Sequence, residues 1–75
     1  MPLTLEEKKY LKKLGNRIIA IREEKGIKQK ELSDLLDIDD GSLRRIESGR
    51  TNPTTTTLLS VSKALNVDIS ELFKF

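Results

Sequence analysis

Two adjacent arginines, Arg44 and Arg45, are the side chains of this sequence best suited to specific recognition chemistry. A guanidinium group can donate paired hydrogen bonds to O6 and N7 of guanine, which is the commonest specific contact with a DNA base. On a helix the two side chains point about 100° apart, so both need not face the same partner. Arg45 lies one turn beyond Gly41 and Ser42 and is the favoured base reader. The competing interpretation is that both arginines are solvated surface charges.

The residue types that are missing limit the chemistry further. The sequence contains no cysteine and no histidine. A disulfide framework, the usual zinc sites and catalysis by a nucleophile with an imidazole are therefore excluded. The sequence also offers no convergent set of acid, base and nucleophile, so we expect neither an enzyme nor a cofactor.

The length and charge predict one small domain with an uneven surface. The 75 residues form a single domain, 1–75, which at this size buries only about 60% of its unfolded surface. The net charge is +2, but residues 1–30 carry nine Lys and Arg against four acids, whereas residues 31–75 carry five against eight. We expect the first third to face phosphates.

No apolar run could span a bilayer and no signal peptide precedes the fold, so we expect a cytoplasmic protein.

Apolar spacing and end signals predict helices and no strands. A helix over about 5–25 begins with a capping box at Thr4 and Glu7 and stops at Gly26. Further helices are expected over about 28–36, 40–48 and 54–66, followed by a short one from Asp68 or Ser70. Asp37, Asp39, Gly49 and Thr54 supply the intervening stop and cap signals.

A single aliphatic core follows from the same spacing. Gly15 lies inside the first helix at a cost of about 1 kcal/mol relative to alanine, which leaves open a bend or a new helix start there, and we expect one helix over about 5–25. The predicted inward residues are Leu11, Leu14, Ile18, Ile21, Leu32, Leu35, Leu36, Leu43, Ile46, Leu58, Val61, Ala64, Leu65 and Leu72.

Two motifs carry a resemblance to a known family. They are Gly-Ile-Lys-Gln-x-x-Leu from Gly26 and Ile-Glu-x-Gly-x-x-x-Pro from Ile46. With these, the chain resembles the phage-repressor-like helix-turn-helix family (Cro/C1-type or XRE-type) over about residues 14–73, with residues 1–13 extending the first helix. The resemblance implies an all-α, compact, five-helix lambda-repressor-like domain whose second and third helices form the helix-turn-helix.

The resemblance also implies roles for individual residues. It places base contacts at the start and middle of the third helix, phosphate contacts around it, and an ion pair between Arg22 and Glu47. The implied base-contacting residues are Asp40, Gly41, Ser42, Arg44 and Arg45, and the implied phosphate-contacting residues are Lys28, Gln29, Ser48, Arg50 and Thr51. The sequence departs from the family pattern at Lys28, Ser33, Asp37, Ser62 and the acidic tip Asp39-Asp40-Gly41.

Several side chains leave two interpretations open. Gln29 can bridge a phosphate and a neighbouring side chain, or be an ordinary exposed polar residue. Asp40 can stabilise the start of a helix or accept a hydrogen bond from cytosine. Arg17 ends a basic run that can reach phosphates or form a solvated helix face. Phe73 and Phe75 can form a two-fold interface or pack on their own domain.

These observations predict a DNA-binding transcription regulator. We expect sequence-specific recognition of double-stranded DNA, with a homodimeric repressor on a palindromic operator and no small-molecule ligand. Control of restriction–modification genes and an antitoxin role are both compatible with this design. The alternative is a protein-interaction module of the same fold with little DNA affinity, which the acidic tip favours.

Overall fold

The computed structural model describes residues 2–75, and all regular structure in that range is helical. The elements are α1 (Leu5–Glu24), α2 (Gln29–Leu36), α3 (Asp40–Glu47), α4 (Thr55–Ala64) and the 3-10 helix η1 (Ile69–Phe73). The predicted all-α class is confirmed, with one difference. The last of the five expected helices is a short 3-10 helix, so the domain has four α-helices. No helix within residues 2–75 is long and apolar enough to cross a membrane.

Local side-chain chemistry sets most helix ends. Thr4 and Glu7 form the expected capping box, with the Thr4 hydroxyl accepting from the Glu7 N–H at 3.0 Å. Asp39 and Thr54 cap α3 and α4. Asp37 ends α2 in the left-handed conformation, with φ of 55°. Each of these contacts satisfies a backbone group that a helix end leaves free.

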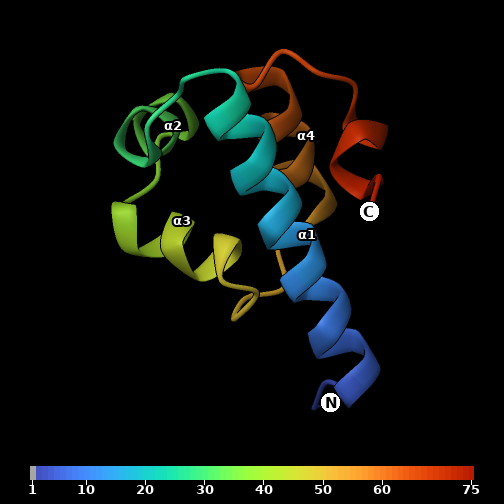
Figure 1. Ribbon diagram of the computed structural model, residues 1–75. Coiled ribbons are helices and arrows are strands. Elements are labelled where there is room, and N and C mark those ends of the chain that lie inside the picture. The colour runs from blue at the N-terminus through green and yellow to red at the C-terminus, as the bar shows by residue number, and fades with distance from the viewer. Residues whose placement is uncertain (1) are drawn as a thin grey trace.

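The helices pack around α1, which is the longest element. Figure 1 shows α2 and α3 on one side of α1, and α4 with η1 on the other. Contacts join α1 to α3 and η1, α2 to α3 and α4, and α4 to η1. The N-terminal half of α1 extends beyond this bundle (Figure 1).

The core is aliphatic, as the spacing predicts. Its buried residues are Leu14, Ile18, Ile21, Leu32, Leu43, Ile46, Leu58, Val61, Leu65 and Leu72. Leu11 is also buried, whereas Leu36 and Ala64 are half-buried. The prediction for Leu35 is wrong, because its side chain is 62% exposed. The buried stripe of α2 includes Ser33, which turns Leu35 toward solvent.

Two glycines allow α1 to approach α3 and the loop that follows it. At Gly15, a Cβ atom would lie 2.3 Å from the Glu47 carbonyl oxygen. At Gly49, which has φ of +77°, it would lie 2.6 Å from the Lys12 Cα. Gly15 therefore marks a close contact between helices, and α1 continues through it from Leu5 to Glu24.

Candidate nucleic-acid interface

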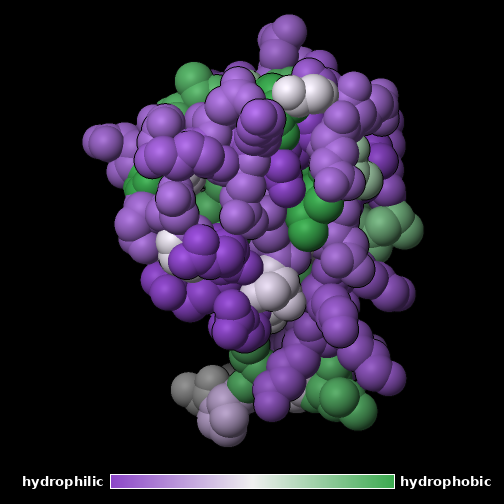
Figure 2. Space-filling model, turned by 60° about the vertical axis from the view of Figure 1, so that its left-hand side comes forward, coloured by the Kyte–Doolittle hydropathy of each residue, from purple (hydrophilic) through white to green (hydrophobic). Residues whose placement is uncertain are grey.

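The outer face of α3 is polar and open. Leu43, Ile46 and Glu47 are buried against the domain, whereas Arg44 and Arg45 are exposed. Figure 2 brings the side with α2 and α3 forward and shows a mostly hydrophilic surface with small, separate apolar spots. An amphipathic helix with this division presents its cationic side to whatever the domain meets.

Hydrogen bonds along one strip of α3 hold the Arg45 guanidinium. Arg45 Nη2 donates to Ser42 Oγ at 3.1 Å, and Ser42 Oγ donates to Asp39 Oδ1 at 2.5 Å. The other Asp39 oxygen accepts from the Ser42 N–H at 3.0 Å. The hydrogen bond from the Ser42 hydroxyl, followed by the one from the Ser42 N–H, lowers the pKa of Asp39 below 3.8. The cap is therefore fully ionised at neutral pH, and its stabilisation is lost only as the pH falls below that value.

The second carboxylate of the acidic tip turns back toward α2. Asp40 Oδ1 accepts from the hydroxyl of buried Ser33 at 2.6 Å and lies 3.9 Å from Lys30 Nζ. Of the two interpretations of Asp40, these contacts favour stabilisation of the start of α3 over base contact. They also join the two helices of the helix-turn-helix through side chains.

Glu47, the last residue of α3, connects three helices. Its carboxylate accepts from Arg22 Nε at 2.8 Å and from Arg22 Nη2 at 3.3 Å. Gln29, the first residue of α2, donates to the same carboxylate at 2.7 Å. The Glu47 side chain is 3% exposed and the Arg22 side chain 11%. The structure thus contains the Arg22–Glu47 pair and makes it a buried link that also orients Gln29.

A shallow hollow beside this link gathers hydrogen-bond donors from α1, α2 and α3. Within it, Arg50 Nε donates to Ser48 Oγ at 2.9 Å. The hollow is lined by Asn16, Ile19, Gln29, Arg44, Glu47, Ser48 and Arg50. Such a group of donors with two guanidinium groups suits a phosphate. The sequence interpretation missed Asn16, which only the packing of α1 against α3 brings to this place.

The remaining residues predicted to contact phosphates lie in different settings. Lys28 precedes α2 and is exposed, and Thr51 is half-buried in the loop after α3. Arg17 lies against the C-terminal end of the chain, where its Nε donates to the Glu71 carbonyl oxygen at 2.8 Å. Its Nη2 also lies 3.6 Å from the Glu71 carboxylate. The structure therefore does not bring Arg17 together with the other predicted phosphate contacts.

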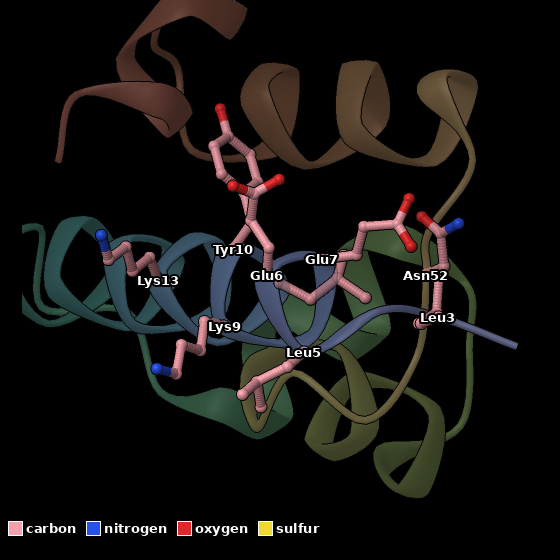
Figure 3. Close-up of a pocket in the computed structure, with 9 residues that line it drawn as sticks. Leu3, Leu5, Glu6, Glu7, Lys9, Tyr10, Lys13 and Asn52 are labelled. Carbon is pink, nitrogen blue, oxygen red and sulfur yellow. The ribbon is translucent and has the colours of Figure 1, made fainter.

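The C-terminal aromatic residues form a separate surface with α1. The rings of Tyr10 and Phe75 meet edge to face, with centroids 5.1 Å apart. Phe73 remains 38% exposed and Phe75 51% exposed. Figure 3 shows Tyr10 on the N-terminal half of α1, pointing away from Lys9 and Leu5 along the edge of a groove. The tail thus packs partly on its own domain and still leaves apolar surface uncovered.

Comparison with known proteins connects this geometry to a family. The model of the family HTH_3, described as helix-turn-helix, matches residues 18–72. The chain is 36% identical over 61 residues to the uncharacterized HTH-type transcriptional regulator y4dJ of Sinorhizobium fredii, a match that covers 81% of this chain and 79% of that protein. It is also 36% identical over 59 residues to the immunity repressor protein of Bacillus phage phi105. That match covers 79% of this chain and 41% of the repressor, so the chain spans less than half of its length.

A solved structure shows the same arrangement of helices. The restriction-modification controller protein C.AhdI from Aeromonas hydrophila superposes with a TM-score of 0.81 at 32% identity. The superposition covers 84% of this chain and 96% of the controller. The similarity therefore includes nearly the whole controller chain, and it is seen in both the sequence and the fold.

Proposed function

The chain belongs to the helix-turn-helix family HTH_3, and we propose that it is a transcriptional regulator that binds double-stranded DNA in a sequence-specific manner. The observation that carries the proposal is the open outer face of α3, where Arg44 and Arg45 are exposed on a helix whose other side is buried. An α-helix of this kind fits the major groove of B-DNA. The transcriptional regulators among the similar proteins support the same function.

Base recognition is assigned to the outer face of α3. Arg45 donates to O6 and N7 of a guanine, with Gly41 and Ser42 lying closest to the bases on the same strip. Arg44 reaches from the edge of this strip into the hollow with Arg50, so its guanidinium can serve a base or a phosphate. We assign Asp40 to stabilising the start of α3 instead of contacting a base, because its Oδ1 accepts from Ser33 and lies 3.9 Å from Lys30 Nζ.

Phosphate contacts are assigned to the rim of the hollow and the residues beside it. These contacts hold α3 in register on the duplex and carry little sequence information. Because Glu47 accepts from the Gln29 amide, the Gln29 side chain is already positioned before DNA binds. The proposed phosphate-contacting residues are Lys28, Gln29, Ser48, Arg50 and Thr51.

The salt dependence of binding tests the phosphate assignment. We expect Arg50→Gln to reduce the slope of log Kobs against log salt by about 0.9 for each phosphate that the variant no longer neutralises, or about 1.8 for a dimer. The matched control is Arg17→Gln, whose guanidinium is bonded to Glu71 and whose slope should equal that of the wild type. A reduced slope for the control would restore Arg17 as a phosphate contact, and an unchanged slope for Arg50→Gln would contradict its assignment.

We further propose a homodimeric repressor that occludes a promoter at a palindromic site. The exposed rings of Phe73 and Phe75, with Tyr10 beside them, are the proposed two-fold contact. A dimer would place two copies of α3 about 34 Å apart, one turn of B-DNA. The similarity to a phage immunity repressor and to a restriction-modification controller supports this regulatory class.

Selection of bound sites from a randomised duplex pool tests the function directly. We expect two inverted half-sites, each with a guanine preference that Arg45→Ala abolishes at one position, with a loss of about 1–3 kcal/mol of discrimination there. Arg50→Gln serves as the control, since it should weaken binding equally for all sequences. If base preference were unaltered in Arg45→Ala, the assignment of Arg45 would be wrong.

The alternative, an interaction module with little DNA affinity, rests on the acidic tip. Both carboxylates of that tip are bonded within the domain, to Ser42 and to Ser33, so the tip does not favour it. A gel shift at low salt against random duplex separates the two functions. Absence of retardation at micromolar protein would leave the interaction module as the better explanation.

A further inference from the structure

We propose that Ser42 is a positioning residue for base recognition, whose hydroxyl, held by Asp39, fixes the direction of the Arg45 guanidinium. The inference depends on the proposed function, in which Arg45 reads a base. It assigns to Ser42 a task other than direct contact with DNA. It also gives Asp39, the acidic residue that caps α3, a part in specificity through its bonds to Ser42.

The hydrogen bonds form an ordered chain along the helix. Asp39, Ser42 and Arg45 are spaced three residues apart, so each side chain lies next to the following one along α3. The Ser42 hydroxyl donates its one proton to Asp39 at 2.5 Å and accepts from Arg45 at 3.1 Å. A hydroxyl can do both at once, because it has one donor and two acceptor lone pairs. Neither bond therefore has to break for the other to form.

The anchor of this chain is itself held at two points. The two oxygens of Asp39 accept from the hydroxyl and from the backbone N–H of Ser42. The carboxylate thus cannot turn without losing the N-terminal cap of α3. Because the cap fixes Asp39, the position of the Ser42 hydroxyl is fixed relative to the helix axis, and with it the acceptor that Arg45 meets.

Gly41 supplies an independent observation. A Cβ atom at this position would lie 3.0 Å from Asp39 Oδ2, 3.5 Å from Arg45 Nη1 and 3.7 Å from Arg44 Nη2. The contact with Asp39 Oδ2 would be tight, whereas the contacts with the two guanidinium nitrogens would be ordinary van der Waals contacts. The absence of a side chain at residue 41 thus leaves room chiefly for the Asp39 carboxylate over the first turn of α3.

The remaining donors of Arg45 are sufficient for a base. A guanidinium has five N–H groups, and the bond to Ser42 uses one of them. Two others can meet O6 and N7 of a guanine in parallel. A long side chain that is held in place before binding loses less conformational freedom on binding, which strengthens the contact with the matching base in particular.

A double-mutant cycle tests the inference on the site selected for the wild-type protein. The cycle compares four proteins, namely the wild type, Ser42→Ala, Arg45→Ala and the double variant. The affinity of each is measured on the selected site and on a second site, which differs at the base pair where Arg45→Ala loses its preference. We expect Ser42→Ala to lower discrimination at that base pair by about fivefold, which lies within the range of interaction energies for two residues in contact. In the Arg45→Ala background the same substitution should change nothing, and Ser42→Thr, which keeps a hydroxyl, should restore discrimination.

The possible outcomes separate this inference from the proposed function. Asp39 still accepts from the backbone N–H of residue 42 in Ser42→Ala, so α3 keeps its cap, and circular dichroism confirms folding. Full discrimination in Ser42→Ala, or an equal loss with and without Arg45, would overturn the positioning role and leave the function intact. If Arg45→Ala relaxed no position, the base reader itself would be wrong, and the inference would fail with it.

Discussion

Glu47→Gln is expected to lower the free energy of unfolding by about 3–5 kcal/mol, the usual cost of breaking a buried ion pair. The carboxylate accepts two hydrogen bonds from Arg22 and one from Gln29. A glutamine amide offers one acceptor oxygen where the carboxylate has two, and its NH2 group would face a donor. The Arg22 guanidinium, which is only 11% exposed, would remain buried without a counter-charge.

Urea denaturation at 25 °C followed by circular dichroism measures this effect. The matched control is Glu71→Gln, because Glu71 pairs with Arg17 at 3.6 Å while 33% of its side chain remains exposed. A partly exposed pair of this kind contributes about 1 kcal/mol or less. Equal losses for the two variants would show that the Glu47 link does not depend on burial and would contradict the prediction.

The expected loss is large compared with the stability of so small a domain. Single domains have unfolding free energies of about 5–15 kcal/mol, and 75 residues place this one at the lower end. A substantial fraction of Glu47→Gln would therefore be unfolded at 37 °C. DNA binds only the folded form, so a specific duplex should recover part of the lost stability.

Gly15→Ala is expected to destabilise the domain by about 3 kcal/mol, the upper end of the range for overpacking. The added methyl group would lie 2.3 Å from the Glu47 carbonyl oxygen and 2.7 Å from two further backbone atoms of α3. Backbone atoms of a packed helix cannot move aside as a flexible side chain can, so α1 and α3 would have to separate. The sign of the change in unfolding free energy is informative, because a glycine-to-alanine substitution in an exposed helix stabilises a protein by about 1 kcal/mol.

Thermal and urea unfolding of Gly15→Ala measure this effect. Asn16→Ala provides the control, since it alters the next residue of α1 on the exposed side and should change stability by no more than about 0.5 kcal/mol. A Gly15→Ala variant as stable as the wild type would mean that α1 and α3 pack less closely than the structure shows.

The helix pattern could be predicted from the sequence because its signals are local. Thr4, Asp39 and Thr54 cap the helices whose starts they predict, and Asp37 ends α2 with a positive φ. Each signal depends on a few neighbouring residues. The final segment is a 3-10 helix because five residues, Ile69–Phe73, form little more than one turn, which a residue pattern does not distinguish from an α-helix.

Features that depend on packing could not be predicted in this way. Gly15 has the sequence appearance of a weak point, and only the position of α3 shows that a methyl group has no room there. Leu35 fits the apolar spacing of α2, but the nearby Ser33 takes the buried place. A periodic pattern identifies a helix face without fixing its edge.

The candidate site also combines features that could be predicted from the sequence with features that depend on packing. The place of Arg45 on α3 follows from the helical spacing, and the Arg22–Glu47 pair follows from the family resemblance. The bonds of Asp39, Ser42 and Arg45, the turn of Asp40 toward Ser33 and the arrival of Asn16 in the hollow depend on side-chain rotamers and helix packing. The charge balance of each segment does not single out the proposed contacts Arg44, Arg45 and Arg50, which come from the part of the chain with more acids than bases.

Because α1 extends beyond the bundle, its two halves differ in local stability. Every residue from Thr4 to Tyr10 is exposed, so the first turns are held chiefly by their own backbone hydrogen bonds and by the capping box at Thr4. Such turns can open and close on their own, exchanging their amide hydrogens with solvent while the rest of the domain stays folded. One continuous helix would thus include both weakly protected and well protected backbone.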